Sequence, residues 1–241
     1  MKLIIDIGNT QAKLAVFEGR QLVSLFSLKN LDPKDIKKIK TKIPSLQSAI
    51  LCSVIKHKQE LIKYLKLNFE FIELHSKISV PIKNLYNTPT ILGSDRLAAV
   101  VGASDLFPNE NVLVIDAGTC IKYDFINKKN EYLGGGISPG LNMRFKALNT
   151  FTGKLPLVRQ KNKFELIGNS TERSVLSGVL NGVVAEVDGI IGYYKKLYPD
   201  TKVIITGGDR VFFDKRLKSN TFAAPNLVLQ GLNIILEYNV R

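Results

Sequence analysis

The feature that most constrains the fold of this chain is a short pattern that occurs twice in it. Each copy is an apolar strand ending in Asp, a turn that contains Gly and Thr, and a second strand that contains Lys. The first copy spans residues 3–17 and the second spans residues 113–125. Their carboxylates, Asp6 and Asp116, lie about one small domain's length of chain apart. The repeat therefore predicts two similar domains that face each other across a phosphate.

The tip of each hairpin has the chemistry of an anion-binding turn. Strands rich in Ile, Leu and Val without a polar break are typical of buried central strands. Glycine lets the backbone approach a ligand closely, and the N–H groups of such a turn, together with a Thr hydroxyl, can bind an anion. An Asp beside a phosphate requires a cation between the two, or a water to orient. A plain hairpin turn uses the same residue types, but two copies at domain spacing favour the functional interpretation.

The composition is that of an ordinary globular protein with one large or two small domains. The chain has 241 residues, of which 45% are hydrophobic and 23% are charged. We expect that no stretch has the length and apolar character of a membrane-spanning helix, and that there is no signal peptide. The two cysteines, Cys52 and Cys120, have neither a metal-binding spacing nor the pattern of a disulfide framework. These features predict a reduced, cytoplasmic protein that does not associate with a membrane.

The net charge of +13 is compatible with a nucleic-acid binder. The lysines, however, are spread along the chain, and their mild clusters alternate with apolar residues at helical spacing, as solvated helix faces do. The chain contains no Trp and no aromatic-rich basic motif on which bases could stack. We therefore expect no nucleic-acid partner, while the same charge would attract small polyanions such as nucleotides.

The order of the expected elements indicates an α/β fold with mixed sheets. Residues 2–28 predict three strands, followed by helices and strands in alternation up to residue 74. A second set repeats this order, with strands at 112–115, 120–126, 131–133 and 202–206 and helices at 139–149, 171–198 and 226–238. Residues 108–111 interrupt the pattern. We therefore expect one domain at residues 1–110 and another at residues 111–241.

The sequence Gly93-Ser94-Asp95-Arg96 precedes an apolar run and predicts a helix N-terminus. Ser94 and Asp95 could cap this helix, because both residue types bond unpaired N–H groups and suit the positive end of the helix dipole. Alternatively, Asp95 is a general base and Arg96 a ligand for an anion. A carboxylate suits that role in phosphoryl transfer, because the attacking hydroxyl loses its proton late in a loose transition state.

Three later segments are also candidates for a site. The glycine-rich segment 134–140 predicts either a flexible loop or a backbone surface that approaches a ligand at a helix N-terminus. Thr171 belongs to a sequence typical of a helix N-cap, and its hydroxyl could also point into a cleft. Thr206-Gly207-Gly208 follows a buried strand and is either a plain turn or a surface for a nucleotide base or ribose.

Taken in order, these motifs resemble the type III pantothenate kinase family. The resemblance rests on Asp6-Ile-Gly-Asn-Thr10 with Lys13, Gly93-Ser-Asp-Arg96, Asp116-Ala-Gly-Thr119, Gly134-Gly-Gly-Ile-Ser-Pro-Gly140, Leu155-Pro156, Gly168 with Thr171, Ser177-Gly178 and Thr206-Gly-Gly208. Single motifs are weakly specific, but the ordered set spans nearly the whole chain. The resemblance implies two ribonuclease-H-like domains of the actin-like and sugar-kinase superfamily, with a nucleotide cleft between them.

The resemblance also implies an activity, which is ATP-dependent phosphorylation of pantothenate by a homodimer, the first step of coenzyme A biosynthesis. Asp95 would take the proton from the primary hydroxyl of pantothenate, and Asp116 would bind a monovalent cation, potassium or ammonium. ATP would bring Mg²⁺ and would contact Asp6, Ile7, Gly8, Asn9, Thr10, Gln11, Ala12, Lys13 and Thr119. Pantothenate, bound near the dimer interface, would contact Tyr86, Gly93, Ser94, Asp95, Arg96 and Thr171.

The chain departs from the family after the second Asp-x-Gly-Thr, where Ala-Thr-Thr is frequent and Cys120-Ile121-Lys122 stands instead. Phosphate contacts beyond Thr119 therefore do not carry over by resemblance. Two other functions stay open at this point: a nucleotide-binding regulatory protein of the same fold, such as an accessory factor for transcription, and a kinase for another small hydroxyl substrate. The intact motif at residues 93–96 argues against the regulatory function.

Overall fold

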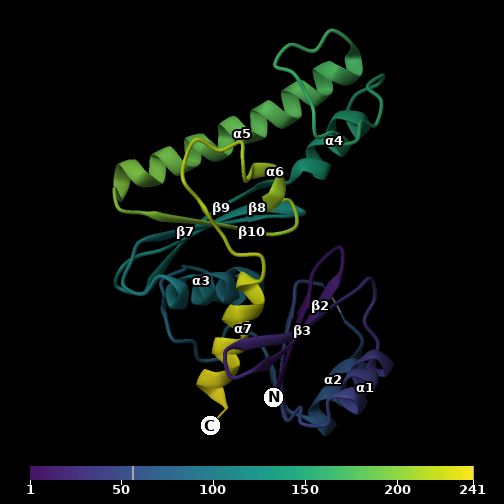
Figure 1. Ribbon diagram of the computed structural model, residues 1–241, viewed down its shortest axis with the longest axis vertical. Helices are drawn as coiled ribbons and strands as arrows, with labels where there is room; N and C mark the ends of the chain where they lie inside the picture. The colour runs from purple at the N-terminus through teal and green to yellow at the C-terminus, as the bar shows by residue number, and fades with distance from the viewer. Residues whose placement is uncertain (56, 241) are drawn as a thin grey trace. The chain divides into compact units, whose positions relative to one another are not determined.

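The computed structural model describes residues 1–55 and 57–240 and divides into two compact units (Figure 1). Unit 1 comprises Met1–Pro108, Asn130–Tyr132 and the chain from Asn226 onward. Unit 2 comprises Asn109–Lys129 and Leu133–Pro225. The chain thus enters unit 2 two residues before the boundary expected at residue 110, and its last helix groups with unit 1 instead of the second domain. The cleft expected between the two domains stays a prediction.

Unit 1 is built around a five-stranded sheet with the order β3-β2-β1-β4-β5. β1, β2 and β3 are antiparallel neighbours, whereas β4 and β5 run parallel to β1, so the sheet is mixed as expected. The elements of this unit are β1 (Lys2–Ile7), β2 (Ala12–Glu18), β3 (Gln21–Leu28), α1 (Pro33–Lys42), β4 (Ser48–Ser53), α2 (Gln59–Asn68), β5 (Glu70–Glu73), β6 (Lys83–Asn84), a 3-10 turn (Pro89–Ile91), α3 (Ser94–Leu106) and α7 (Leu227–Asn239).

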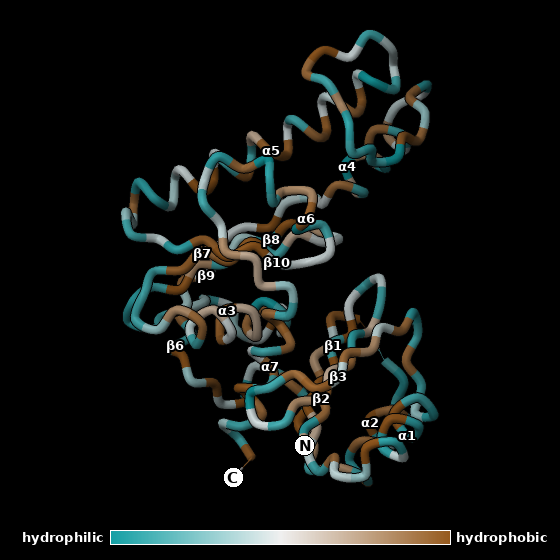
Figure 2. Tube along the Cα trace, viewed as in Figure 1, coloured by the Kyte–Doolittle hydropathy of each residue, from teal (hydrophilic) through white to brown (hydrophobic). Residues whose placement is uncertain are grey.

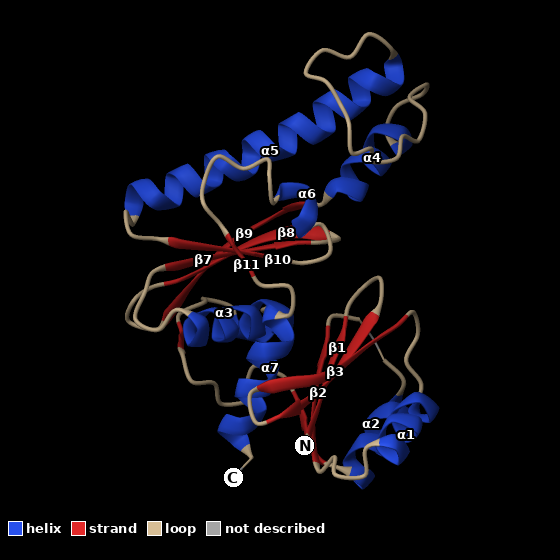
Figure 3. Cartoon of the chain, viewed as in Figure 1, coloured by secondary structure: helices blue, strands red, loops and turns tan. Residues whose placement is uncertain are grey.

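The alternation of side chains along β1 decides which layer each residue faces. Leu3, Ile5 and Ile7 are buried in one cluster with residues of α1 and α2, the two helices that Figure 3 shows beside the strands of this unit. The opposite face of the sheet contacts α3 and α7. These two helices approach closely at their glycines, because a Cβ at Gly231 would lie only 1.8 Å from the carbonyl oxygen of Ala98. Asp6 shares the face that contacts α3 and α7.

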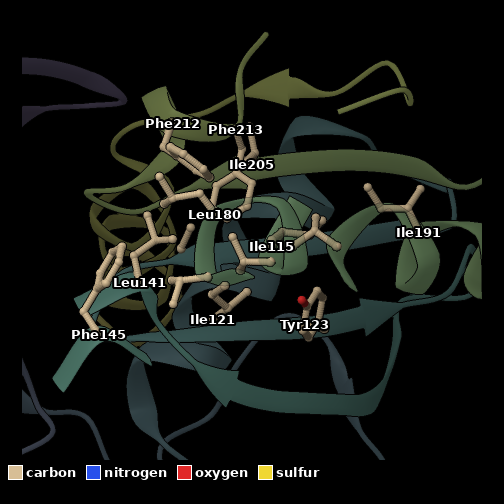
Figure 4. Close-up of a cluster of buried hydrophobic side chains, with 14 of the residues drawn as sticks. Ile115, Ile121, Tyr123, Leu141, Phe145, Leu180, Ile191, Ile205, Phe212 and Phe213 are labelled. Atoms are coloured by element: carbon tan, nitrogen blue, oxygen red, sulfur yellow. The ribbon is translucent and has the colours of Figure 1, made fainter. Parts of the chain in front are cut away.

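Unit 2 holds most of a six-stranded sheet with the order β11-β10-β7-β8-β9-β6. Its elements are β7 (Val112–Ala117), β8 (Cys120–Ile126), β9 (Glu131–Pro139), α4 (Leu141–Thr150), α5 (Thr171–Leu197), β10 (Lys202–Thr206), α6 (Arg210–Phe213) and β11 (Phe222–Ala223). Figure 4 shows Leu180 and Ile191 of α5 in one buried cluster with Ile115 of β7 and Ile205 of β10. The core of this unit therefore lies between the long helix and the sheet.

α5 is the one helix among residues 1–55 and 57–240 that is long and apolar enough to cross a membrane by length and composition. The expectation that no segment has this character was therefore wrong. Its buried residues nevertheless recur at the helical spacing of a core-facing stripe, as at Leu180, Val183, Val187 and Ile191. Figure 2 shows hydrophobic and hydrophilic residues alternating along the helix. The core helix of a soluble protein produces the same pattern, so length and composition alone are weak evidence of a membrane span.

The glycine-rich segment is a strand and not the loop that the sequence suggested. β9 continues through Gly134, Gly135 and Gly136 to Pro139. A Cβ at Gly135 would lie 1.7 Å from the carbonyl oxygen of Tyr123, so glycine is what allows β9 to press against β8 at this point. Gly135 thus serves a close approach to the backbone of the protein itself.

Candidate active site

The first hairpin presents an exposed turn between β1 and β2. Asp6 lies opposite Lys13 in the strand register. The N–H of Gly8 donates to the carbonyl oxygen of Gln11 at 3.1 Å and closes the turn. The residues between them, Asn9 and Thr10, are exposed. A closed turn with an exposed rim that begins beside an Asp–Lys pair is suited to binding an anion.

The start of α3 lies against the same sheet face as this pair. Cys52 of β4 is the register partner of Asp6 on its other side, and residues in register share one face of a sheet. The sulfur of Cys52 lies 3.1 Å from Oγ of Ser94, the first residue of α3. The fold therefore brings together, within unit 1, the two sequence-distant motifs that hold Asp6 and Asp95.

Asp95 lies in the first turn of α3, with its carboxylate turned back toward the helix start. Its Oδ1 accepts a hydrogen bond from the N–H of Arg96 at 2.9 Å. A Cβ at Gly93 would lie 2.6 Å from the same oxygen, so glycine keeps this position clear. The helix is preceded by Gly93 as its N-cap residue, which offers no side chain. The carboxylate of Asp95 therefore accepts from one of the N–H groups at the start of α3.

Arg96 and Tyr86 form a cationic and aromatic cluster beside Asp95. The Arg96 side chain is buried, and its guanidinium carbon lies 5.5 Å from the ring centroid of Tyr86. Tyr86 in turn stacks on Tyr132, with ring centroids 6.0 Å apart and ring planes 7° from parallel. A guanidinium held over an aromatic face is positioned before a ligand arrives. The structure thus brings Tyr86 together with the residues 93–96 that were expected to share a site with it.

The second hairpin repeats the register of the first and carries an ion pair between two partly buried side chains. Asp116 of β7 lies opposite Lys122 of β8. Nζ of Lys122 is 2.6 Å from Oδ2 of Asp116, and the two side chains are only 18% and 15% exposed. On the other side, a Cβ at Gly207 would lie 2.6 Å from Oδ1 of Asp116, so the backbone that follows β10 packs against that oxygen. Gly207 has a φ of 90°, a conformation open to glycine.

This arrangement does not fit a free monovalent cation at Asp116. Such an ion needs several oxygen ligands that replace its hydration shell. Here one carboxylate oxygen already contacts an ammonium group and the other is packed against backbone. The expected cation site is therefore filled by groups of the chain.

The turn that carries Thr119 is held by the start of α4. The N–H of Gly118 donates to the carbonyl oxygen of Cys120 at 3.0 Å, and the N–H of Gly140 donates to the carbonyl oxygen of Thr119 at 3.1 Å. A Cβ at Gly140 would lie 2.2 Å from the carbonyl oxygen of Gly118. Thr119 itself is exposed. Its hydroxyl therefore projects from a turn that glycine packing holds in place.

Thr171 belongs to unit 2, whereas Tyr86 and residues 93–96 belong to unit 1, so neither unit alone assembles the whole expected pantothenate site. Thr171 begins α5, directly after Ser170, whose Oγ accepts from the N–H of Arg173 at 3.3 Å. It lines a cavity of about 980 Å³ beside α4 and α5. Other residues that line this cavity are Arg144, Leu148, Leu155, Gly168 and Val175.

A polar network beside this cavity was not anticipated from the sequence. Arg144 of α4 places Nη2 2.6 Å from Oε2 of Glu186 on α5 and 2.8 Å from Oγ of Ser138. The hydroxyl of Tyr123 donates to Oε1 of Glu186 at 3.1 Å. Burial, reinforced by the charge of Glu186, raises the pKa of Tyr123. Because these residues come from four separate elements, no sequence spacing could have revealed the network.

The pKa of Glu186 results from opposing effects. Burial of the carboxyl group raises the pKa. Hydrogen bonds from Ser138 and Arg144 and the charge of Arg144 lower it by more, so the pKa of Glu186 lies below its ordinary value. The Glu186 carboxylate is therefore held in its charged form, and its ion pair with Arg144 links α5 to α4.

A magnesium ion that arrives with ATP fits the residues present. Among residues 1–55 and 57–240, no group of three His, Cys, Asp or Glu side chains is placed to hold a metal ion. Mg²⁺ in kinases typically takes one or two carboxylates and fills its other positions with phosphate oxygens and water. Asp6, beside the exposed turn of the first hairpin, can supply such a carboxylate.

Comparison with solved structures shows the fold. A protein from Campylobacter jejuni, described as a conserved putative Baf family transcriptional activator, has a TM-score of 0.65 at 24% identity over 98% of each chain. The ROK hexokinase of Thermus thermophilus has a TM-score of 0.57 at 11% identity over 99% of each chain. The expected α/β fold with mixed sheets, which these solved structures share, is thereby confirmed.

Comparison with known sequences shows the family. A family model described as type III pantothenate kinase matches residues 2–192. The type III pantothenate kinase of Phocaeicola vulgatus is 49% identical over 240 residues, which cover 99% of each chain. That of Christiangramia forsetii is 44% identical over 241 residues, again 99% of each chain. Because the match extends over the whole length and includes the motifs at Asp6, Asp95 and Asp116, this chain belongs to the type III pantothenate kinase family.

Proposed function

We propose that this chain is an ATP-dependent kinase that phosphorylates the primary hydroxyl of pantothenate to give 4′-phosphopantothenate, the first step of coenzyme A biosynthesis. Family membership supports the substrate. The observation that carries the mechanism is the contact between Cys52, the register partner of Asp6, and Ser94, which brings the phosphate-binding hairpin and the Asp95 motif to one sheet face.

In this proposal, Asp95 is the general base. The hydroxyl oxygen of pantothenate attacks the γ-phosphorus of ATP, the bond from that phosphorus to the bridging oxygen breaks, and ADP leaves with that oxygen. The proton of the hydroxyl passes to the Asp95 carboxylate. Arg96 and Tyr86 bind and orient pantothenate beside it, with the backbone of Gly93 and the hydroxyl of Ser94 lining the same site. Thr171 contributes a further contact to pantothenate.

The remaining expected residues serve the nucleotide. Residues 6–13, which are Asp6, Ile7, Gly8, Asn9, Thr10, Gln11, Ala12 and Lys13, form the phosphate-binding hairpin. Asp6 would hold the magnesium ion, which neutralises charge on the phosphates, and Lys13 would pair with a phosphate oxygen. Thr119 contacts ATP from the turn of the second hairpin. Asp116 supplies the carboxylate that binds one positive charge beside that turn.

We further propose that the protein acts as a cytoplasmic homodimer. The segment between α4 and α5 exposes large apolar side chains, with Phe151 85% and Ile167 80% exposed. It adjoins the cavity that Thr171 lines. An apolar surface of this kind is typical of a protein–protein contact. A second copy of the chain would cover it close to the proposed pantothenate contact.

The test is pantothenate-dependent formation of ADP by purified protein with ATP and Mg²⁺, compared between the natural chain and Asp95→Asn. We expect Asp95→Asn to lower kcat by at least about 100-fold, as loss of a general base does. ATP affinity, measured by calorimetry, and the circular dichroism spectrum should not change. The matched control is Asp105→Asn, on the same helix, because Asp105 makes an exposed ion pair with Arg20 and should leave turnover within about twofold.

Undiminished turnover in Asp95→Asn would contradict the role of this residue. ADP formation that does not depend on pantothenate, in protein that binds ATP, would contradict the substrate. A screen of other small hydroxyl compounds would then identify the acceptor.

A further inference from the structure

We propose that the ammonium group of Lys122 takes the place of a free monovalent cation at Asp116, so that this enzyme needs neither potassium nor ammonium for turnover. The inference rests on the proposed kinase function, because it concerns the charge beside the nucleotide-binding turn. Its starting point is the ion pair between Lys122 and Asp116.

The strand register makes this ion pair a fixed feature of the hairpin. Asp116 and Lys122 are direct cross-strand partners, and such partners project from the same face of the sheet. The contact of 2.6 Å is that of a charge-assisted hydrogen bond. Because both side chains are largely buried, water screens the pair less than it would a surface ion pair. The ammonium is therefore held where it meets the carboxylate.

An ammonium group supplies what a monovalent cation would supply there. It carries one positive charge, and its N–H groups can donate to oxygen atoms around it. An uncompensated Asp116 would repel phosphates that approach Thr119, three residues further on, and the Lys122 charge offsets that repulsion. Because the ammonium is tethered to the chain, its binding to Asp116 costs no translational freedom, unlike that of a free ion.

The packing around the Asp116 carboxylate also favours the tethered ammonium group over a free cation. The backbone at Gly207 packs against Oδ1, and Lys122 contacts Oδ2, so both oxygens have neighbours that belong to the chain. A free cation would have to displace the ammonium and leave it buried without its carboxylate. Removing one partner from a buried pair is costly, so the exchange is unfavourable.

The experiment measures pantothenate-dependent turnover at one ionic strength in potassium, ammonium, sodium or choline chloride, for the natural chain and for Lys122→Met. We expect the natural chain to change by less than about twofold among the four salts. Lys122→Met should lose at least about tenfold in choline or sodium, and potassium or ammonium should restore it to within about threefold. The matched control is Lys13→Met, at the same register position of the first hairpin, which should lose turnover that no cation restores.

A second measurement does not depend on turnover. The melting temperature of Lys122→Met without substrates should rise with potassium above its value in choline, because the ion binds the folded state. That of the natural chain should not respond to the identity of the cation. If Lys122→Met does not fold in choline, the double variant Asp116→Asn/Lys122→Met replaces it, because it leaves no buried charge unpaired. It should fold and show no preference among the salts.

The outcomes separate this inference from the proposed function. Turnover by the natural chain that rises by about tenfold or more with potassium would overturn the inference and leave the kinase function intact. No turnover in any salt would remove the kinase function, and a melting temperature of the natural chain that rises specifically with potassium would then still overturn the inference.

Discussion

The two hairpins have the same register but different surroundings, and the difference assigns them different tasks. In each, an Asp near the end of the first strand lies opposite a Lys in the second. The first turn, residues 8–11, is mostly exposed. The second turn is held by Gly140, and its Asp116 lies in an ion pair against Gly207.

The comparison teaches that a duplicated sequence determines strand pairing but not the tertiary contacts of each copy. Unit 1 leaves its Asp–Lys pair beside an exposed turn and the start of α3, where a substrate and a magnesium ion can reach it. Unit 2 holds its pair in an ion-pair contact of 2.6 Å, and its Tyr123–Glu186–Arg144 network links β8 to α4 and α5. We therefore expect the first hairpin to act in the chemistry and the second to hold charge and shape.

The largest effect should come from Gly140 and Gly207, which pack against the backbone of the second hairpin. Gly140→Ala and Gly207→Ala would each place a methyl group against backbone, 2.2 Å and 2.1 Å from a carbonyl oxygen, and Gly207 also has a positive φ. We expect each to lower the free energy of unfolding by about 3 kcal/mol or more. Gly8→Ala and Gly118→Ala are the controls, because their Cβ atoms meet no close neighbour, and they should cost less than about 1 kcal/mol. Denaturant unfolding would measure the loss in free energy of unfolding of each variant. Equal losses in all four variants would contradict the comparison.

The next effect concerns the roles of the two carboxylates. Asp6→Asn should lower kcat/KM at least about 100-fold, or about 2.7 kcal/mol, because a charge beside the phosphates and magnesium ion is lost. The double variant Asp116→Asn/Lys122→Met removes both buried charges of the second hairpin together and should stay within about tenfold of the natural chain. Steady-state kinetics with pantothenate and ATP would measure both. A double variant as inactive as Asp6→Asn would show that the two hairpins contribute alike.

The smallest effect tests the network under the second hairpin. Glu186→Gln should lower the free energy of unfolding by about 1–2 kcal/mol at pH 7, because it weakens the contacts to Arg144 and Tyr123. Since folding lowers the pKa of Glu186, its contribution is complete above the ordinary value of 4.5 and is lost as the pH falls through the lowered folded value. The difference between variant and natural chain should therefore be constant above the ordinary value of 4.5 and shrink as the pH falls below it.

The control for this measurement is Glu172→Gln, also on α5, because the Glu172–Lys161 ion pair is more than half exposed on both sides. Its cost at pH 7 should be at most about 0.5–1 kcal/mol, from an exposed pair and a first-turn charge. A Glu186 variant whose cost does not shrink as the carboxyl group becomes protonated would contradict the network as described.

Much of the fold could be predicted because local patterns carried it. The apolar runs of β1, β7 and β10 were identified as strands from the sequence. The grouping of α7 with unit 1 could not be predicted. An amphipathic pattern indicates that a helix packs on another element but does not identify that element. The packing of α7 on α3 depends on close contact at Gly102 and Gly231.

The candidate site divides in the same way. The motifs at Asp6 and at residues 93–96 were visible as residue types in a pattern, since a strand end with a glycine turn and a helix start are local features. What the glycines at 135, 140 and 207 do was not visible, because each faces backbone distant from it in sequence. The pairing of Arg144 with Glu186 was hidden for the same reason.

The sequence by itself determined the repeated hairpin, the register that sets each Asp opposite a Lys, and the resemblance that indicated the family, because these depend on neighbours along the chain or across one turn. Only the tertiary structure decided that Cys52 joins the Asp6 row to Ser94 and that Gly207 packs against Asp116. Burial and long-range contact depend on how separate elements pack, and packing is a property of the assembled core and not of any single segment.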